Sequence, residues 1–538
     1  MPPSLSARSS RWGWLACWLL LLALAAVRPL ALPDEGRYAE VSRWMLVSGD
    51  WRVPRLNGLP FFHKPPLLHW LQAGFMGILG VTPWAARLVP ALAAGGMLAG
   101  LYFATRRLAS ERLARTAAWI LATSPAFLLA GQYINHDMLV AAWIATALWC
   151  FALAFMHPTA TTPDGRPTRP HASWARAGFA ACALGVLTKG LIGVVLPGAV
   201  LFVWLSVTRR WRQVPNLPWV SGLALLTAIA APWFLLAARD HPGLWNYMFG
   251  LQQFGRYTGS GFNNAQPWWF YVVVGSALLA PWPLLLLYRP RAAATADDRR
   301  LGDLLWLCWA WVGTVLLFFS LPRSKLVGYI LPVMPALAVL CAAAWSRLTA
   351  RRPAWAPWFA VLVALPLVVS VAATFGVARF GSDRLNGEAA AALACLAAPQ
   401  DPVYLLPPGA YPYDLPFVAQ TQRPFIEVQN WPVQRQIAGD SWRRELMDAG
   451  DFAPLAAAQL LQTPDVLPDA AQAPHRWLLT GPRSAPETHA ATYARMGWRP
   501  VYDDRRWTIW RSAPESPETA EQERLPGCHQ QPGDQRRP

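Results

Sequence analysis

The sequence predicts a polytopic α-helical membrane protein with a small C-terminal α/β domain. Of its 538 residues, 54% are hydrophobic and only 14% are charged, whereas soluble domains are about a quarter charged. Apolar runs of about 20 residues, the length that crosses a bilayer, recur along the chain. From residue 381 the composition becomes polar, and short β-rich pieces alternate with helical stretches, which predicts the C-terminal domain.

The first apolar run, residues 12–27, follows Arg8 and Arg11 and could be a signal peptide. The run is long, has no small-x-small cleavage pattern and leads directly into a polar cluster, so we interpret it as a retained first span. Further runs give about eleven spans in all. They cover residues 84–104, 113–130, 139–156, 174–187, 191–207, 219–238, 268–287, 301–319, 326–345 and 355–377.

Arginines gather in every second connection between the runs, which the positive-inside rule places on the cytoplasmic side. These clusters fall within residues 8–11, 106–115, 166–176, 209–212, 289–300 and 347–352. The first loop, residues 31–83, faces outward in this scheme, yet it carries Arg37, Arg43, Arg52, Arg55 and Lys64. We expect these cations to serve an anionic lipid phosphate. With an odd number of spans, the C-terminal domain also faces outward.

The first loop opens with the acid pair Asp34 and Glu35, directly after the first span. Because charged groups are costly at the bilayer centre, we expect this cluster at the membrane interface. Tyr38, Val41 and Met45 follow helical spacing, which predicts an amphipathic helix lying in the membrane plane. The transmembrane domain with this loop would therefore cover residues 1–380.

The C-terminal α/β domain is predicted over residues 381–513, with a disordered tail at residues 514–538 that is rich in Pro, Glu and Gln. Its predicted strands cover residues 403–406, 424–428, 476–480 and 506–511. The seven cysteines show no CxxC spacing, which argues against a disulfide framework or a cysteine zinc site. The net charge of +17 is spread in small groups, which argues against nucleic-acid binding.

Residues 34–70 closely resemble the first outer loop of the ArnT-like glycosyltransferases, the aminoarabinose transferases of lipid A, which belong with the protein O-mannosyltransferases in the GT-C fold class. The resemblance is carried by DEGRYAE at 34–40, SGDW at 48–51, PRLNG at 54–58, KPP at 64–66, NHDM at 135–138, LTKG at 187–190, QPWWFY at 266–271 and SKLVGYILP at 324–332.

This resemblance implies that a sugar is moved from a polyprenyl-phosphate carrier to an acceptor such as lipid A, at the outer face of the bacterial inner membrane. It implies a catalytic role for the acid Asp34, with Glu35 in reserve. Residues expected to hold the donor phosphate and the acceptor are Arg37, Tyr38, Lys64, Lys325 and Tyr329, to which the outer-loop cations Arg55 and Lys189 are added.

Transfer from a polyprenyl phosphate needs an anion sink for the departing phosphate and a group that orients or deprotonates the acceptor. The loop cations can supply the first and Asp34 the second. One carboxylate poised for direct displacement predicts inversion at the sugar carbon. The alternative for Asp34 is a helix cap. Lys64 could instead extend to lipid head groups, and Lys325 and Tyr329 could anchor a span at the interface.

Several relatives hold a divalent metal with a Glu before the loop Lys, an Asp in the next outer loop and a later His. This chain has His63 and Asp137 at the first two positions, while residues 251–254 offer no His. His63 and Asp137 are candidate ligands for zinc or magnesium, but the departure from the pattern argues against a metal.

Three other functions stay open from the sequence. A protein O-glycosyltransferase of the same fold would need true base catalysis by Asp34 and hence a pH dependence. A transporter or flippase of lipid-linked sugars would show inverted repeats and broken helices, and neither is expected here. An envelope sensor would use the spans only as a scaffold. The identity of the sugar is not encoded in a short motif.

Overall fold

The computed structural model describes residues 7–157, 169–255, 257, 259, 263–287, 298–381, 386–407, 409, 411–481 and 487–512. The chain forms two compact units. The helical unit combines Met1–Pro29 with Phe62–Phe380, and the sheet unit combines Leu30–Phe61 with Gly381–Pro538. Residues 30–61 of the first loop therefore group with the C-terminal residues, whereas the sequence analysis assigned the loop to the transmembrane domain. The predicted tail, residues 514–538, lies outside the described residues.

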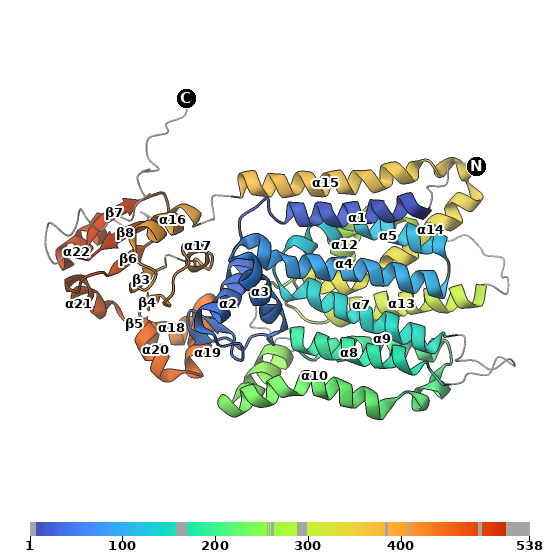
Figure 1. Ribbon diagram of the computed structural model, residues 1–538, viewed down its shortest axis with the longest axis horizontal. Helices are drawn as coiled ribbons and strands as arrows, with labels where there is room; N and C mark the ends of the chain where they lie inside the picture. Colours follow the sequence, from blue (N-terminus) through green and yellow to red (C-terminus); the bar gives the residue numbers. More distant parts are fainter. Residues whose placement is uncertain are drawn as a thin grey trace. The chain divides into compact units, whose positions relative to one another are not determined.

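The helical unit is built from long helices that lie side by side (Figure 1). Its elements are α1 (Ala7–Leu24), α3 (Leu67–Leu79), α4 (Pro83–Leu108), α5 (Glu111–Ala122), α6 (Pro125–Leu128), η1 (Ala130–Gln132), α7 (His136–Phe155), α8 (Ala172–Lys189), α9 (Ile192–Val207), η3 (Trp211–Asn216), α10 (Trp219–Asp240), η4 (Asn246–Gly255), α12 (Phe270–Leu278), η5 (Trp282–Leu287), α13 (Asp298–Ser320), η6 (Val327–Val333), α14 (Met334–Arg351), η7 (Pro353–Trp355) and α15 (Trp358–Phe380).

The predicted class, a multi-helix membrane protein with a C-terminal α/β domain, is confirmed, and helical structure lies in every predicted apolar run. The expected number of spans is not reproduced by length and apolar composition. Among the described residues six helices are long and apolar enough to cross a membrane, or seven if one bent pair counts as a single span. Several runs fail this test because their helices are short, as α9 is with 16 residues.

Two of the predicted runs are interrupted. The run at 113–130 bends by 59° between α5 and the α6–η1 segment, where Ser124 accepts a hydrogen bond from the N–H of Phe127 at 3.2 Å and Pro125 starts the new helix. The run at 268–287 stops after α12 and resumes at η5, with Pro281 in the gap. The sequence analysis expected no broken helices, and this expectation was wrong. The continuity of the helices therefore gives no argument against a transporter.

Helix α7 lies at the centre of the helical unit. Nearly all of its side chains are buried, which fits a helix that is apolar on all faces. It packs between α4 and α8. Its start is fixed by Asn135, whose side-chain oxygen accepts a hydrogen bond from the N–H of Asp137 at 2.9 Å. This cap holds Asp137 at one end of the most buried helix.

The sheet unit is an α/β domain with a six-stranded sheet of order β5-β4-β3-β6-β8-β7. Strands β3 to β6 pair in parallel, and β7 and β8 pair antiparallel. Its elements are α2 (Asp34–Ser48), β1 (Arg55–Leu56), β2 (Leu59–Pro60), α16 (Gly387–Leu396), β3 (Val403–Leu406), α17 (Leu415–Ala419), β4 (Ile426–Val428), α18 (Trp431–Ile437), α19 (Trp442–Asp451), α20 (Pro454–Leu460), β5 (Leu461–Gln462), η9 (Pro464–Val466), α21 (Leu467–Gln472), β6 (Trp477–Thr480), α22 (Glu487–Met496), β7 (Arg499–Asp503) and β8 (Thr508–Arg511).

Helix α2 forms where the first loop predicted a helix, and Gly49 ends it with a left-handed backbone at φ 68°. The expected environment was wrong. Glu40 and Arg43 have side chains only 4% and 3% exposed and pair at 2.7 Å, while Val41 joins the hydrophobic core of the sheet unit. Glu40 and Arg43 neutralise each other inside the protein, so the buried middle of the helix presents no polar face to water.

The hairpin β1–β2 continues the same packing. Asn57 and Gly58 both have positive φ, at 49° and 76°, as a two-residue hairpin turn requires. The Asn57 side chain then donates to the carbonyl of Phe425 at 2.9 Å and accepts from its N–H at 2.7 Å. The asparagine and glycine of the PRLNG motif thus shape a turn and fix it beside β4.

Glu427 on β4 predicts a pH-dependent stability of the sheet unit. Its carboxyl is fully buried and accepts a hydrogen bond from the Tyr411 hydroxyl at 2.7 Å. Burial raises its pKa from 4.5 to about 8. The folded state therefore keeps the proton up to about pH 8, while the unfolded chain releases it above about pH 4.5, so stability should fall as pH rises through this window.

We expect the free energy of unfolding to fall by up to about 1.4 kcal/mol per pH unit in this window. In Glu427→Gln, which carries a neutral side chain of the same size, that slope should be clearly smaller; burial also raises the pKa of Glu40 and Asp414, which remain in the variant. The measurement is the urea concentration at which half of the sheet unit is unfolded in the full chain. Unfolding is monitored by proteolysis, at several values between about pH 5 and pH 8. Equal slopes in both proteins would assign the effect to another group.

Candidate active site

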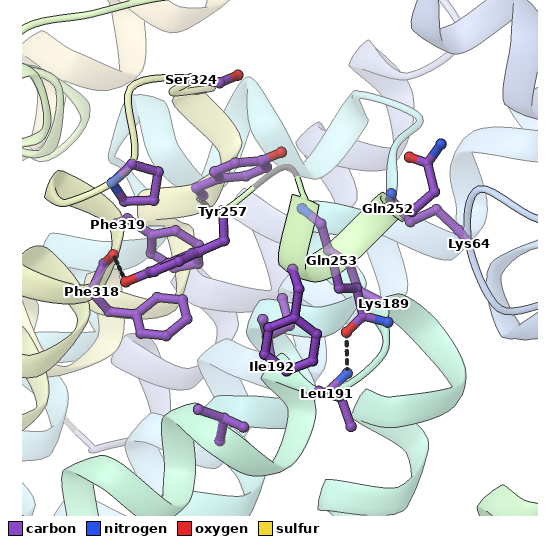
Figure 2. Close-up of a pocket in the computed structure, with 14 residues that line it drawn as sticks. Lys64, Lys189, Leu191, Ile192, Gln252, Gln253, Tyr257, Phe318, Phe319 and Ser324 are labelled. Atoms are coloured by element: carbon purple, nitrogen blue, oxygen red, sulfur yellow. Dashed lines mark hydrogen bonds between the residues drawn. The ribbon is translucent and has the colours of Figure 1, made fainter. Parts of the chain in front are cut away.

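A pocket of about 280 Å³ opens in the helical unit, and we call it the lysine pocket. It is lined by Lys64, Lys189, Leu191, Ile192, Val195, Gln252, Gln253, Phe254, Tyr257, Phe318, Phe319, Pro322, Ser324 and Tyr329. Figure 2 shows the two lysines and two glutamines on one side and Phe318 and Phe319 on the other. The pocket therefore has a polar, cationic part and an apolar part.

Lys189 ends α8 and carries the cationic part of the lysine pocket. Its ammonium group pairs with the Asp137 carboxylate and lies 4.1 Å from the centre of the Tyr329 ring. Gly328 allows this arrangement, because a Cβ atom there would overlap the Asp137 side chain. The NHDM, LTKG and SKLVGYILP motifs, which lie far apart in the sequence, thus meet at one ion pair.

The glycine of LTKG has its own structural reason. Gly190 has φ 85°, and the side chain of Gln253 fills the space where a Cβ atom would lie. Gln253 accepts a hydrogen bond from the N–H of Leu191 at 2.9 Å, which the dashed line in Figure 2 marks. Gln252 and Gln253 were not predicted as site residues, because the metal-binding pattern of the relatives directs attention at residues 251–254 only to a histidine. The sequence signal for them is the pair of adjacent amide side chains between the apolar residues Leu251 and Phe254.

The apolar part of the lysine pocket comes from different elements. Ile192 and Val195 lie on the first turn of α9, Phe254 on η4, and Phe318 and Phe319 on the last turn of α13. Such a surface suits a hydrocarbon chain, since the side chains of these five residues carry no hydrogen-bonding groups. An amphiphile with an anionic head would match both parts of the pocket.

Lys64 and His63 precede α3. The Lys64 ammonium donates to the carbonyl of His63 at 2.9 Å and lines the pocket. His63 is buried, with its ring centre 5.9 Å from that of Tyr247. Within the described residues no three His, Cys, Asp or Glu side chains are grouped as a metal site needs. Since Asp137 is paired with Lys189, the residues present do not fit the metal site suggested by His63 and Asp137.

Lys325 is placed differently from the other two lysines. It is buried, and its ammonium donates to the carbonyls of Gln266 (2.9 Å) and Pro322. Burial lowers its pKa. It does not line the lysine pocket, although Ser324 and Tyr329 on either side do. The contacts show Lys325 tying two loops of the helical unit together, and its contact with a phosphate stays a prediction.

In the sheet unit Asp34 starts α2 and keeps a partly accessible carboxylate. Its side chain is 33% exposed and accepts from Arg37 at 2.6 Å. The alternative that Asp34 caps the helix was wrong, because Pro33 holds the capping position and no side chain caps it. Glu35 is instead fully buried and accepts from the N–H of Ala31 at 2.8 Å. Of the two acids, Asp34 is the one available for chemistry.

Arg37 is held on several sides. It bridges Asp34 and Glu445, and its guanidinium lies 5.0 Å from the ring centre of Tyr38 and 5.6 Å from that of Tyr413. Burial alone would lower its pKa, but the charge of Glu445 raises it overall, so the guanidinium stays charged. Glu445 and Tyr413 were missed because nothing local in the sequence connects them to the first loop.

Arg55 stabilises the hairpin at the end of the first loop. It pairs with Asp50 at 3.1 Å and donates to the carbonyl of Gly58 at 3.2 Å. Its role toward a phosphate stays a prediction. The predicted site residues thus fall into two groups. The sheet unit contains Asp34, Glu35, Arg37, Tyr38 and Arg55, and the helical unit contains His63, Lys64, Asp137, Lys189, Lys325 and Tyr329.

Comparison with known proteins places these motifs in context. Residues 14–248 match the family model described as dolichyl-phosphate-mannose-protein mannosyltransferase. The chain is 35% identical over 338 residues to the undecaprenyl phosphate-alpha-4-amino-4-deoxy-L-arabinose arabinosyl transferase 1 of Sodalis glossinidius, covering 62% of this chain and 58% of that relative. It is 33% identical to the corresponding transferase of Aeromonas salmonicida, covering 59% and 56%. The match thus spans less than two thirds of these relatives' length.

The fold is similar along almost the whole chain to a solved structure. The crystal structure of ArnT from Cupriavidus metallidurans bound to undecaprenyl phosphate superposes with a TM-score of 0.75 and 26% identity, covering 94% of this chain and 99% of that one. The similarity in fold therefore includes both the helical bundle and the C-terminal sheet, beyond the part matched in sequence.

Proposed function

We propose that this chain is a glycosyltransferase of the bacterial inner membrane, because it is similar in sequence to aminoarabinose transferases and similar in fold to ArnT. It moves a sugar from a polyprenyl-phosphate carrier to lipid A or a related envelope glycolipid. The names of the matched relatives supply the class of donor, an undecaprenyl phosphate that carries an amino sugar.

One observation carries the proposal, namely the two-part character of the lysine pocket. Lys64 and Lys189 supply cationic groups at one side, and the side chains of Phe318 and Phe319 form an apolar surface at the other. A polyprenyl phosphate has the same two parts, a phosphate head and a hydrocarbon chain. Lysine binds phosphate as a compact charge, and burial of the prenyl chain adds the hydrophobic contribution.

The proposed chemistry is a direct displacement. An acceptor oxygen forms a bond to the anomeric carbon of the sugar, the bond from that carbon to the donor phosphate oxygen breaks, and the electron pair stays on the phosphate. Lys64 and Lys189 stabilise the negative charge that develops there. Asp34 positions the acceptor, which needs no base if it is already an ionised phosphate. His63 and Asp137 do not form a metal site among the described residues, so the proposal assigns no role to a metal.

We further propose that the lysine pocket and the sheet unit face the periplasm. The support is the distribution of arginines, which gather in every second connection of the helical unit. Lipid A on the outer leaflet would then reach the same membrane surface as the sugar donor.

Mass spectrometry of lipid A from cells with and without this chain tests the proposed function. We expect an added sugar on a lipid A phosphate only when the chain is present. A sugar found on a periplasmic protein instead would identify a protein O-glycosyltransferase. Unmodified acceptors, together with movement of the lipid-linked sugar across vesicles that contain the purified chain, would identify a transporter and refute the proposal.

A further inference from the structure

A second cavity of about 560 Å³ lies in the helical unit, and we call it the arginine pocket. It is bounded by the end of α7, the segment after α9 and the start of α13. Its charged lining consists of Arg210, Arg299, Arg300 and Asp303. Neither the motifs of the first loop nor the proposed transfer reaction uses these residues.

The arginine pocket has an excess of positive charge. Arg210 pairs with Asp303, the one carboxylate in the lining, which leaves two guanidinium groups without a lining acid. Arg299 and Arg300 are both exposed, and Arg300 donates to the carbonyl of Met156 at 3.2 Å; within the described residues no acid is paired with either of them. His157 also lines the cavity. An anion with oxygen acceptors would complement this lining.

The lowered pKa of His157 is consistent with the excess of positive charge in the arginine pocket. The ring centre of His157 lies 4.4 Å from that of His171. Burial and then the charges of His171, Arg300 and Arg107 lower its pKa. The basic groups near this cavity therefore jointly disfavour the protonated form of His157. They come from elements that are far apart in the sequence.

The two pockets lie at opposite ends of the helical unit. Helix α13 contributes Arg299 and Arg300 from its first turn to the arginine pocket, and Phe318 and Phe319 from its last turn to the lysine pocket. A helix of 23 residues is about 35 Å long, and the hydrocarbon core of a bilayer is about 30 Å thick. The arginine pocket is thus expected at the other membrane surface.

Aromatic side chains mark this surface as a lipid interface. Trp306, which lines the pocket, is 53% exposed, and Trp211, next to the lining residue Arg210, is 40% exposed. Exposed tryptophans on membrane helices concentrate where head groups meet the hydrocarbon core. A ligand that reaches the arginine pocket beside Trp306 can therefore come from the membrane itself.

We propose that the arginine pocket binds the phosphate of an anionic glycerophospholipid from the leaflet opposite the lysine pocket. Guanidinium groups form paired hydrogen bonds with phosphate oxygens, and basic pockets between membrane helices are suited to anionic head groups. Trp306 packs against the lipid at the level of its head group. This inference does not depend on the transfer reaction, and its failure would leave the proposed function intact.

Gly302 gives a sharp test, because it lines the arginine pocket and a Cβ atom there would meet nothing within 4 Å. Gly302→Glu adds a carboxylate at the site, and Gly302→Gln adds a neutral side chain of the same size. Both should be tolerated, since glycine is a poor residue inside a helix. We expect Gly302→Glu to weaken binding of phosphatidylglycerol about tenfold, and Gly302→Gln to bind as the unchanged protein does.

The measurement uses the full chain in neutral detergent, titrated with phosphatidylglycerol, with native mass spectrometry and the thermal midpoint as readouts. A second variant, Arg299→Gln with Arg300→Gln, should lose the same binding. Its matched control, Arg351→Gln with Arg352→Gln, removes the last residue of α14 and the residue that follows it, both outside the lining, and it should keep the binding. Thermal midpoints without lipid report whether each variant is folded.

Inorganic phosphate and phosphatidylcholine separate the sources of the ligand. Stabilisation by phosphatidylglycerol alone supports a lipid site. Equal stabilisation by inorganic phosphate, abolished by Gly302→Glu, would overturn the lipid assignment in favour of a soluble phosphate compound. Equal lipid binding in Gly302→Glu and Gly302→Gln would overturn the proposal altogether.

Discussion

Replacing Asp34 with Asn is expected to reduce sugar transfer about 10²-fold or more, the loss expected when a group that positions the acceptor is removed. Asp34 combines a charge with access, since its side chain is 33% exposed while it is paired with Arg37. The variant should remain folded, because partly exposed ion pairs contribute only about 0–1 kcal/mol to stability. Turnover by purified protein with a polyprenyl-phosphate sugar donor measures the effect.

The neighbouring acid provides the matched control. Glu35 is fully buried, and its carboxylate accepts from the backbone of Ala31, so Glu35→Gln keeps an acceptor oxygen in the same place. We expect transfer to change little in this variant. A large loss in Glu35→Gln with full activity in Asp34→Asn would move the catalytic role from one acid to the other. Full activity in both variants would remove carboxylate catalysis from the first loop.

The pH dependence of transfer adds a second readout on Asp34. A phosphate acceptor is already ionised and Asp34 then only positions it, so transfer should not follow the protonation of a catalytic base. A Ser or Thr acceptor would need its proton removed by Asp34 and would give a rate that falls as the carboxylate is protonated. The profile therefore separates the lipid acceptor from the protein acceptor without identifying either product.

The sequence could predict the elements whose signals are local. Hydropathy located the helical segments, and β3 begins and ends at the predicted residues Val403 and Leu406, because a short apolar run between polar segments is a direct signal for a buried strand. Strand β5 was missed because it has two residues, and β7 because it is largely exposed and contains Pro500.

The sequence could not predict the partners of its charged residues. Helix α2 was predicted as an amphipathic helix in the membrane plane, because the pairing of Glu40 with Arg43 inside the protein is invisible to a hydropathy pattern. Arg37 was singled out, while Glu445, which holds it, lies about 400 positions away. Periodicity reports the face of a single element, and only the fold decides what covers that face.

Asp137 and Lys189 show how motif residues can serve stability and function together. The sequence presented them separately, one as a metal ligand and one as a phosphate-binding cation, whereas the fold pairs them beside Tyr329. Their side chains are only 8% and 11% exposed. A buried charge left without its partner is strongly unfavourable, so a single substitution would mix two effects that a pair of variants can separate.

Lys189→Met is therefore expected to destabilise the helical unit by about 3–5 kcal/mol, because Asp137 would stay buried without its counter-charge. The double variant Asp137→Asn with Lys189→Met should recover most of that stability, since neither charge is then left alone. Thermal midpoints of the two purified proteins in detergent measure the difference. Similar midpoints for the single and double variants would mean that the pair contributes little to stability.

Binding of a polyprenyl phosphate should respond differently from stability. Lys189 is proposed to hold the donor phosphate, so both the single and the double variant should bind it about tenfold or more weakly, the loss expected for one charge-assisted contact. Asp137→Asn alone keeps the lysine and releases it from its partner, so it should bind the lipid at least as well as the unchanged protein. If the double variant regained binding together with stability, Lys189 would be a structural residue, and the cationic part of the lysine pocket would rest on Lys64.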